Sequence, residues 1–455
     1  MTDMDETPSS QITLTADIEG AALPKENVGL QTDEFPEGGL QAWATVAGAF
    51  IVQFCGFGYT TSFGVYQDFY TREYLSQSSA SAISWIGSIN AFLIISGGLV
   101  AGRVYDRGHF YLLVCGGALL QCFSLFMLSL CKPQQLYQIF LAQGLGTGLG
   151  SGAMYVPTMA VVSHYFRRRR TLAMAIVATG TPLGAVIHPI MLNHTLSSSA
   201  LGFGNAVRAS AGLVSVLLIV ACLLMRPRLP PAPNQLPFWE SLWRFARDRA
   251  YVFTTLGMAT YAVGVYFPLF YLQLDAVKHG VNDRLAFYSL VIMNGASVVG
   301  RLTPAFFAGR AGNKIFRVMI LAAGCGAVSI LCMIAVKNSA SVVVVGVLYG
   351  LSVGVYITLI PPLLAILTED IKELGLRMGV AFAVMGVGGL VGPPINGALL
   401  ASDYVWWRPA LFSGLTAVFG VCCFVATLLE LWRRNNKNVA TDAEAGLKVG
   451  VGGPH

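Results

Sequence analysis

One arginine within an apolar stretch is the residue of this sequence most suited to chemistry. Arg301 lies in LAFYSLVIMNGASVVGRLTPAFFA (285–308), about seven residues before the apolar run ends. At about 1.5 Å per residue, its guanidinium would sit roughly 10 Å inside a membrane boundary. A charge at that depth is costly and is normally tolerated where it faces a bundle interior or a water-filled cavity. We therefore interpret Arg301 as the contact for an anionic group of a bound solute.

The predicted spans contain no Asp or Glu except Glu430 at the end of the last one, so Arg301 has no obvious acidic partner at membrane depth. An incoming anion, or a polarised carbonyl, would then complete its pairing. The alternative is that the side chain extends toward the membrane surface and donates to carbonyls at a helix end. Both interpretations remain open at the level of sequence.

The other candidate cavity residues are a histidine and several hydrogen-bonding side chains. His188, ahead of Pro189, could relay a proton because histidine changes charge near neutral pH, although packing is the alternative. The remaining candidates could bond a solute, but hydrogen bonds between helices would explain each of them as well. They are Tyr59, Asn90, Asn294 and Tyr356, with Gln53, Tyr155 and Asn396 as further members.

Composition indicates the setting of these residues. Of 455 residues, 55% are hydrophobic and only 11% are charged, against about 25% charged in a typical soluble domain. The chain is therefore expected to be an integral, all-α membrane protein. Twelve apolar runs approach the ~20 residues that a bilayer requires. They cover residues 41–63, 82–103, 110–131, 137–161, 171–192, 206–225, 251–273, 285–308, 315–336, 340–364, 377–400 and 405–431.

Polar segments divide these runs into two groups of six. The acidic segment 1–38 predicts a disordered tail, and the Pro-rich, basic segment 226–249 predicts a linker. We expect six-helix bundles over 39–225 and 250–432, followed by a tail over 433–455.

Lys and Arg predict the orientation of the chain. With the N-terminus inside, 21 of them fall in cytosolic segments and only 7 in outer ones, so both termini are expected in the cytosol. The sequon Asn193-His194-Thr195 then falls on an outer loop, where Asn193 could be glycosylated.

Small-residue spacings recur in the two groups. Gly144-x-x-x-Gly148 in run four matches Gly350-x-x-x-Gly354 in run ten. Gly180-x-x-x-Gly184 in run five matches Gly388-x-x-x-Gly392 in run eleven. Such spacings allow close helix approach. Their matching positions predict a duplicated six-helix unit with a site between the halves.

The segment Gly98-x-x-x-Gly102-Arg103-x-x-Asp106-Arg107-Gly108 between runs two and three resembles the loop signature of major facilitator transporters. In that signature the glycines allow helices to approach. The resemblance implies a gate at this loop, in which Gly102, Arg103, Asp106 and Arg107 form a charged latch.

Two further segments resemble the monocarboxylate porter family, in its fungal-type branch. Pro36-Glu37-Gly38-Gly39-Leu40-Gln41-Ala42-Trp43 is similar to its first signature, with Leu40 where an aromatic residue is common. Tyr165 to Ala175, with four arginines ending at Arg170, is similar to its second signature. A Trp anchor after a turn and a positive-inside segment are the plainer explanations of these two stretches.

The resemblance implies that Arg301 contacts a substrate carboxylate. It gives the plasma membrane as the default location, with vacuolar or other internal membranes as the alternative. It also exposes departures from the family pattern. Ser297 and about Thr61 stand where proton-coupled animal members carry Asp and Lys, so proton coupling is an open question. Gly309 stands at the acidic latch position of the second half.

We predict a transporter that moves a carboxylate-bearing organic solute by alternating access, with one chain sufficient for transport. No enzyme activity, cofactor, metal or nucleic-acid partner is expected, because the spans lack clustered His or acidic residues and the chain lacks GxxxxGK[ST]. Two alternatives are a non-transporting receptor on the same scaffold and an exporter of a bulky uncharged metabolite.

Overall fold

Helices make up the regular structure of the part of the chain that the computed structural model describes, with no strand in that part. The described residues are 36–166, 169–196, 202–228, 237–307, 314–368, 373–400 and 405–450. Because a backbone in lipid must satisfy its own hydrogen bonds, apolar runs of this length fold as helices. The predicted all-α class is confirmed. The residues 1–35, Arg167, Arg168 and Gly309, for which the sequence also made predictions, lie outside the described residues.

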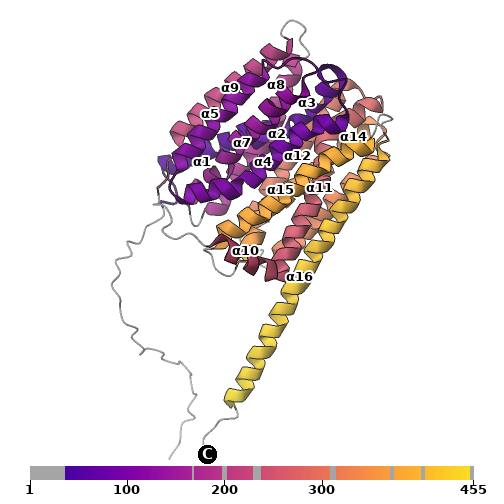
Figure 1. Ribbon diagram of the computed structural model, residues 1–455. Helices are drawn as coiled ribbons and strands as arrows, with labels where there is room; N and C mark the ends of the chain where they lie inside the picture. Colours follow the sequence, from indigo (N-terminus) through magenta and orange to yellow (C-terminus); the bar gives the residue numbers. More distant parts are fainter. Residues whose placement is uncertain are drawn as a thin grey trace, which may run out of the picture. The chain divides into compact units, whose positions relative to one another are not determined.

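The helices of the first half precede a short helix, α10, in the predicted linker (Figure 1). The first half comprises α1 Leu40–Cys55, α2 Phe57–Thr61, α3 Phe63–Phe69, α4 Ala80–Asp106, α5 Phe110–Leu128, α6 Leu136–Ile139, α7 Thr147–Val162, α8 Arg170–Leu196 and α9 Gly202–Leu224. The linker helix and second half comprise α10 Phe238–Arg247, α11 Arg249–Lys278, α12 Asp283–Phe307, α13 Lys314–Cys332, α14 Ser339–Ile366, α15 Leu374–Leu400 and α16 Trp407–Gly450. Short segments of other helix types are Tyr70–Tyr74, Phe140–Gly146 (both π) and Met333–Ala335 (3₁₀).

Eleven helical stretches within the described residues are long and apolar enough to cross a membrane. The remaining predicted span, 137–161, is divided among α6, the π segment Phe140–Gly146 and α7, which follow one another without a break. Every predicted run therefore coincides with helix.

The first span is longer than predicted, and it is broken. It runs from Leu40 to Tyr74, with interruptions at Gly56 and Ser62. Asp68 lies within it and is only 3% exposed. The prediction that no span apart from the last contains an acidic residue is therefore wrong.

The same correction applies to the first helix of the second half. α11 continues to Lys278, beyond the predicted limit of 273, and contains Asp275 at 1% exposure. Each acidic residue has a basic partner one turn later, Arg72 for Asp68 and His279 for Asp275. Such an i, i+4 pair allows a helix to continue past the apolar run from which the span was predicted.

The predicted sequon does not lie on a loop. Asn193 and Thr195 belong to the last turn of α8, and the Thr195 hydroxyl donates to the carbonyl of Met191 at 2.9 Å. The outer-loop assignment was wrong because α8 extends past residue 192. Glycosylation of Asn193 stays a prediction.

The repeated glycines occupy matching places in the two halves. A Cβ at Gly180 or Gly184 of α8 would overlap the carbonyl oxygens of Phe50 and Phe54 on α1. These positions require glycine because the backbones of α1 and α8 are nearly in contact.

The corresponding contact in the second half joins α15 to α11. There, a Cβ at Gly388 or Gly392 would overlap the carbonyl oxygens of Ala259 and Val263. In both halves the glycines lie four residues apart and face carbonyls four residues apart. The duplicated packing supports two pseudo-symmetric bundles.

The two halves meet along α4 with α15 and along α8 with α12 (Figure 1). The Ser81 hydroxyl of α4 donates to the carbonyl of Pro394 on α15 at 2.9 Å. Further along α4, the Ser96 hydroxyl donates to the carbonyl of Ala383 at 3.2 Å. We call the end of the bundle where α4 ends and α8 and α15 begin the basic end, because Arg103, Arg170 and Arg377 lie there; the end near Ser81 is the opposite end.

Candidate functional site

Arg301 lies at the interface between the halves. It belongs to α12, is only 6% exposed, and donates from Nη1 to the carbonyl oxygen of Ala178 on α8 at 2.8 Å. Among the described residues, its Nε has no hydrogen-bond partner and its guanidinium forms no ion pair. The guanidinium is therefore held by a backbone dipole and retains unused donors.

The carbonyl of Ala178 is available because of a proline. In an α-helix that carbonyl accepts the N–H of the residue four positions later, which here is Pro182. Proline has no N–H, so the helix leaves the oxygen without its usual donor. Arg301 supplies the donor from the other half of the molecule. Ala178 lies two turns inside α8, so this carbonyl is not at a helix end.

Small residues bring Arg301 to this position. Gly300 packs against Gly354 of α14, and a Cβ at Gly354 would overlap the carbonyl of Ser297. Because α12 and α14 pack this closely, the backbone at Arg301 is fixed. Tyr155 of α7, on the other half, packs against Phe57, with ring centroids 6.0 Å apart.

His188 is not brought to Arg301. It lies ten residues after Ala178 on α8, which is about 15 Å along the helix axis. Its ring is fully buried between Phe54 and Tyr59, at ring-centroid distances of 4.7 and 5.2 Å, and makes no side-chain hydrogen bond among the described residues. The hydroxyl of Tyr59 lies 2.6 Å from that of Tyr66.

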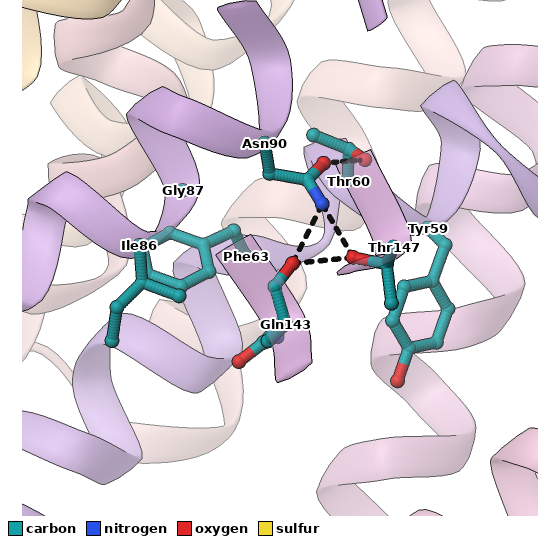
Figure 2. A pocket seen from close by; sticks show the side chains of 8 residues that line it. All are labelled: Tyr59, Thr60, Phe63, Ile86, Gly87, Asn90, Gln143 and Thr147. Atoms are coloured by element: carbon teal, nitrogen blue, oxygen red, sulfur yellow. Dashed lines mark hydrogen bonds between the residues drawn. The ribbon is translucent and has the colours of Figure 1, made fainter. Parts of the chain in front are cut away.

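Asn90 lies at the centre of a hydrogen-bond network inside the first half, shown in Figure 2. Its amide oxygen accepts from the Thr60 hydroxyl. Its amide nitrogen donates to the carbonyl of Gln143 at 2.7 Å and to the hydroxyl of Thr147. The adjacent cavity measures about 10 Å³, roughly the space of one water molecule. Asn90 thus joins α2, α4 and α7 through bonds within the protein.

Asn294 and Tyr356 lie in the second half. The Asn294 amide donates to the carbonyl of Leu290 in its own helix at 2.9 Å. Tyr356 is buried against Tyr261, with ring centroids 4.3 Å apart, and neither hydroxyl has a hydrogen-bond partner among the described residues. Two unsatisfied hydroxyls side by side can bond a polar atom that enters between the helices.

Sequence reasoning missed a contact between the halves at the opposite end. Gln273 of α11 donates from Nε2 to Oδ2 of Asp68 at 3.4 Å, and the rings of Phe63 and Phe270 lie 5.2 Å apart. The other carboxylate oxygen of Asp68, Oδ1, has no hydrogen-bond partner in the part of the chain that the structure describes. The i, i+4 spacing of Asp68 and Arg72 was the available sequence signal.

The predicted gate segment ends α4 at the basic end. Arg103 lies 4.3 Å from the ring centroid of Phe238, which belongs to α10. Among the described residues Asp106 makes no ion pair. The charged contacts at this end instead centre on Asp248, which accepts from Arg377 at 2.9 Å and from Arg434 at 2.6 Å.

Asp248 lies just before α11 and anchors three elements. Burial alone would raise the pKa of its carboxyl, but hydrogen bonds from Arg434 and Arg377 outweigh that effect and hold the pKa below its usual value. Arg377 also lies 3.4 Å from Glu373, and Glu373 lies 2.8 Å from Arg244 of α10. The linker helix is thereby tied to the second half.

The two signature segments at the N-terminal side contact each other. The Glu37 carboxylate accepts from the backbone N–H of Arg169 at 3.1 Å, immediately before α8 begins at Arg170. The rings of Trp43 and Phe166 lie 5.2 Å apart. Glu37 therefore satisfies a donor near the helix start from a distant part of the chain. In the second half, Asp248 just before α11 accepts instead from the guanidinium of Arg377 near the start of α15.

Two bundles with small-residue contacts, broken helices and a buried cation at their meeting line define a secondary transporter. The chain matches the Major Facilitator Superfamily over residues 45–304 and 293–451. It belongs to that superfamily, and it is a membrane transporter rather than an enzyme.

Curated relatives span most of the chain. It is 37% identical over 401 residues to MFS-type transporter 1 of an Ophiocordyceps species, with 88% of this chain and 87% of the relative covered. It is 38% identical over 403 residues to Aspyridones efflux protein apdF of Emericella nidulans, with 88% and 80% covered. It is 36% identical over 391 residues to Agnestins efflux protein AgnL12 of Paecilomyces divaricatus, with 86% and 88% covered.

Proposed function

We propose that this transporter exports a carboxylate-bearing organic metabolite, with Arg301 as the anion contact. The observation that carries the proposal is the buried guanidinium, which has no carboxylate partner among the described residues and keeps donors unused. A carboxylate can take two parallel N–H bonds from a guanidinium, which a single carbonyl oxygen cannot. A solute carboxylate would therefore displace the Ala178 carbonyl.

Displacing that carbonyl would couple binding to movement. The Arg301 bond to Ala178 joins α12 to α8, so an anion that replaces it removes a link between the halves. Contacts at the opposite end, such as that between Asp68 and Gln273, must also break when that end opens. Alternating access then consists of rocking the bundle over 39–225 against the bundle over 250–432.

The efflux direction rests on the relatives. Two of those described above carry the word efflux in their names, and the names specify aspyridones and agnestins as what they export. We infer an organic metabolite of comparable chemical complexity as the cargo here. The rings of Tyr261 and Tyr356, tilted by 36° with centroids 4.3 Å apart, would suit a ring-containing solute. The monocarboxylate-porter likeness of the two signature segments supports a carboxylate on it.

We further infer that the basic end faces the cytosol of a plasma-membrane protein, with both termini on that side. In this orientation the gate toward the cytosol is formed by residues at the ends of α4 and the start of α8. These residues are Gly102, Arg103, Asp106, Arg107 and Arg170. The same proposal includes coupling of solute transport to proton movement, with His188 as the residue that relays the proton.

A metabolite comparison tests the cargo. Cells that lack the protein and cells that overproduce it would be compared for the ratio of external to internal metabolites, with Arg301→Ala and Arg301→Lys produced at equal surface levels. We expect overproduction to raise the ratio for one or a few carboxylates, and both variants to abolish the rise, because Lys cannot form the paired bonds.

The methyl ester of the exported carboxylate provides the matched control. We expect the wild-type protein to export the acid and not the ester. Equal export of both by wild type and Arg301→Ala would instead favour an uncharged cargo. Binding without flux for every compound would favour a receptor.

A further inference from the structure

A groove at the basic end lies between α4 of the first half and the linker helix α10. Its volume is about 340 Å³, within the range of small-ligand pockets. It is lined by Leu99, Val100, Arg103, Val104, Arg107 and Phe238. Five of these residues follow one face of α4, at spacings of one and three residues.

The groove changes from apolar to cationic along its length. Of the lining residues on α4, Leu99 and Val100 lie furthest from the basic end of the helix. Arg107 lies two turns beyond Leu99, about 12 Å along the axis. The guanidinium of Arg103 covers the ring of Phe238 between these two ends. Such a gradient matches an amphiphile with an acyl chain and an anionic head group.

The groove opens onto surface that faces lipid. Val100 is 67% exposed although it lies in the membrane-spanning helix Ala80–Asp106. An exposed valine at that depth contacts acyl chains in a bilayer. A lipid molecule can therefore reach the groove from the side.

The outer face of α10 has the composition of a membrane-interface helix. Trp239 and Trp243, one turn apart, are 71% and 69% exposed. On the other face, Phe245 is fully buried and Arg244 pairs with Glu373 at 2.8 Å. Tryptophan favours the head-group layer, so two of them held outward indicate that α10 lies in that layer.

We propose that this groove binds one anionic phospholipid, with its phosphate between Arg103 and Arg107 and its chain along Leu99 and Val104. The occupant is assigned by charge complementarity and by the continuity of the groove with the lipid-facing surface of α4. Because α10 is tied to the second half through Glu373, the lipid would bridge the two halves at the basic end. The proposal does not depend on the identity of the cargo.

Lipid retention in mixed nanodiscs tests the proposal. The full-length protein would be reconstituted with phosphatidylcholine and phosphatidylglycerol, released into mild detergent, and analysed by native mass spectrometry for lipid that stays bound. We expect one phosphatidylglycerol on the wild-type protein. The double variant Arg103→Gln, Arg107→Gln should bind it about 25-fold more weakly, at about fivefold per arginine.

A double variant at the same end provides the matched control. Arg317 and Arg433 are exposed, flank other spans at the basic end, and do not line the groove. Arg317→Gln, Arg433→Gln removes the same charge and should leave retention unchanged. Equal retention in the two double variants, or equal losses, would overturn the site.

A fluorescence measurement needs neither arginine variant. Brominated phospholipid quenches tryptophans within the bilayer interface, and Trp239→Phe, Trp243→Phe removes the two on α10. We expect the wild-type protein to lose a larger part of its emission than this variant does. Identical fractional quenching would show that α10 lies away from the lipid and would overturn its placement.

If the arginine variants do not fold, preferential retention of phosphatidylglycerol over phosphatidylcholine by the wild type decides the case.

Discussion

Arg301 and Pro182 lie on different halves of the molecule and act on the same carbonyl oxygen. Pro182 leaves the carbonyl of Ala178 without its helical N–H, and Arg301 donates to it at 2.8 Å. A buried guanidinium and an unpaired buried carbonyl would each be costly alone. Together they form a link between α8 and α12 that involves no carboxylate. A stronger acceptor can take the place of the Ala178 carbonyl in that link.

Replacing Pro182 should therefore change how strongly Arg301 is engaged. In Pro182→Ala the new N–H donates to Ala178, so the guanidinium loses part of its bond to that oxygen. We expect the KM for an anionic cargo to fall about threefold, since hydrogen bonds to charged groups contribute about 1.5–3 kcal/mol and only part is released. The measurement is concentration-dependent export in vesicles.

Pro189→Ala is the control for that experiment. It also restores an N–H within α8, but toward Ala185, which Arg301 does not contact. Its KM should match that of the wild type. A similar fall in both variants would point to stiffening of α8 rather than to Arg301.

The Asp68 contact with Gln273 should hold the opposite end closed. In Gln273→Ala the hydrogen bond to a buried carboxylate is lost, and conformations open at that end should gain about tenfold in population. Spin labels at Gln77 and Arg284, both exposed at that end, would report longer distances.

Gln67→Ala is the matched control for the opposite end, because the one side-chain hydrogen bond of Gln67 to a described residue is to the carbonyl of Ala80, within its own half. Its label distances should equal those of the parent protein. An unchanged distribution in Gln273→Ala would mean that the phenylalanine contacts alone close this end.

Asp248→Asn should destabilise the protein in a pH-dependent manner. The folded-state pKa of Asp248 is lowered, so its stabilisation is complete above the unfolded pKa of about 4 and is lost as pH falls through the lower folded value. We expect the variant to unfold at a lower temperature near pH 7, by the equivalent of about 1–3 kcal/mol. The difference in unfolding temperature between the wild type and Asp248→Asn should narrow as pH falls below about 4.

Thermal unfolding in detergent from pH 7 to the lowest pH that the protein tolerates provides the measurement. Glu240→Gln on α10 removes an exposed carboxylate with no ion pair among the described residues, so its curve should follow the wild type. If the unfolding temperature of Asp248→Asn differed from that of the wild type by the same amount at every pH, the explanation by an ionised Asp248 would be contradicted.

Glycines at the helix crossings should tolerate no side chain. Gly184→Ala and Gly392→Ala would each place a methyl group against a carbonyl of the neighbouring helix. We expect both to lower folded yield, by similar amounts because the two contacts are equivalent. Size-exclusion profiles of the detergent-solubilised protein provide the readout.

Gly212→Ala on α9 is the comparison for this pair, because its Cβ would meet open space. It should leave the yield unchanged, or raise it through the better helix propensity of alanine, about 1 kcal/mol. Equal losses in all three variants would show that helix flexibility, and not close packing, explains the glycines.

The sequence predicts the local structure of single helices better than it predicts contacts between distant segments. The α-helical spans follow from apolar runs, and the prediction held even where a π segment interrupts the helix at Phe140. The apolar runs did not predict the full lengths of the first and seventh spans. The predicted runs stop at residues 63 and 273, short of Asp68 and Asp275, yet both aspartates are buried in helical segments that continue past them. A hydropathy argument counts a charge as an end, whereas the interior accepts it when a partner lies one turn away.

The candidate site shows the same division. The sequence by itself determined that Arg301 lies deep in a span and that glycines repeat in both halves, because both depend on residue type and spacing along one helix. Only the tertiary structure decided that Arg301 meets the carbonyl freed by Pro182, that Glu37 meets Arg169, and that Asp68 meets Gln273. Each of these contacts joins segments more than a hundred residues apart, and their pairing is set by how the helices pack rather than by any local preference.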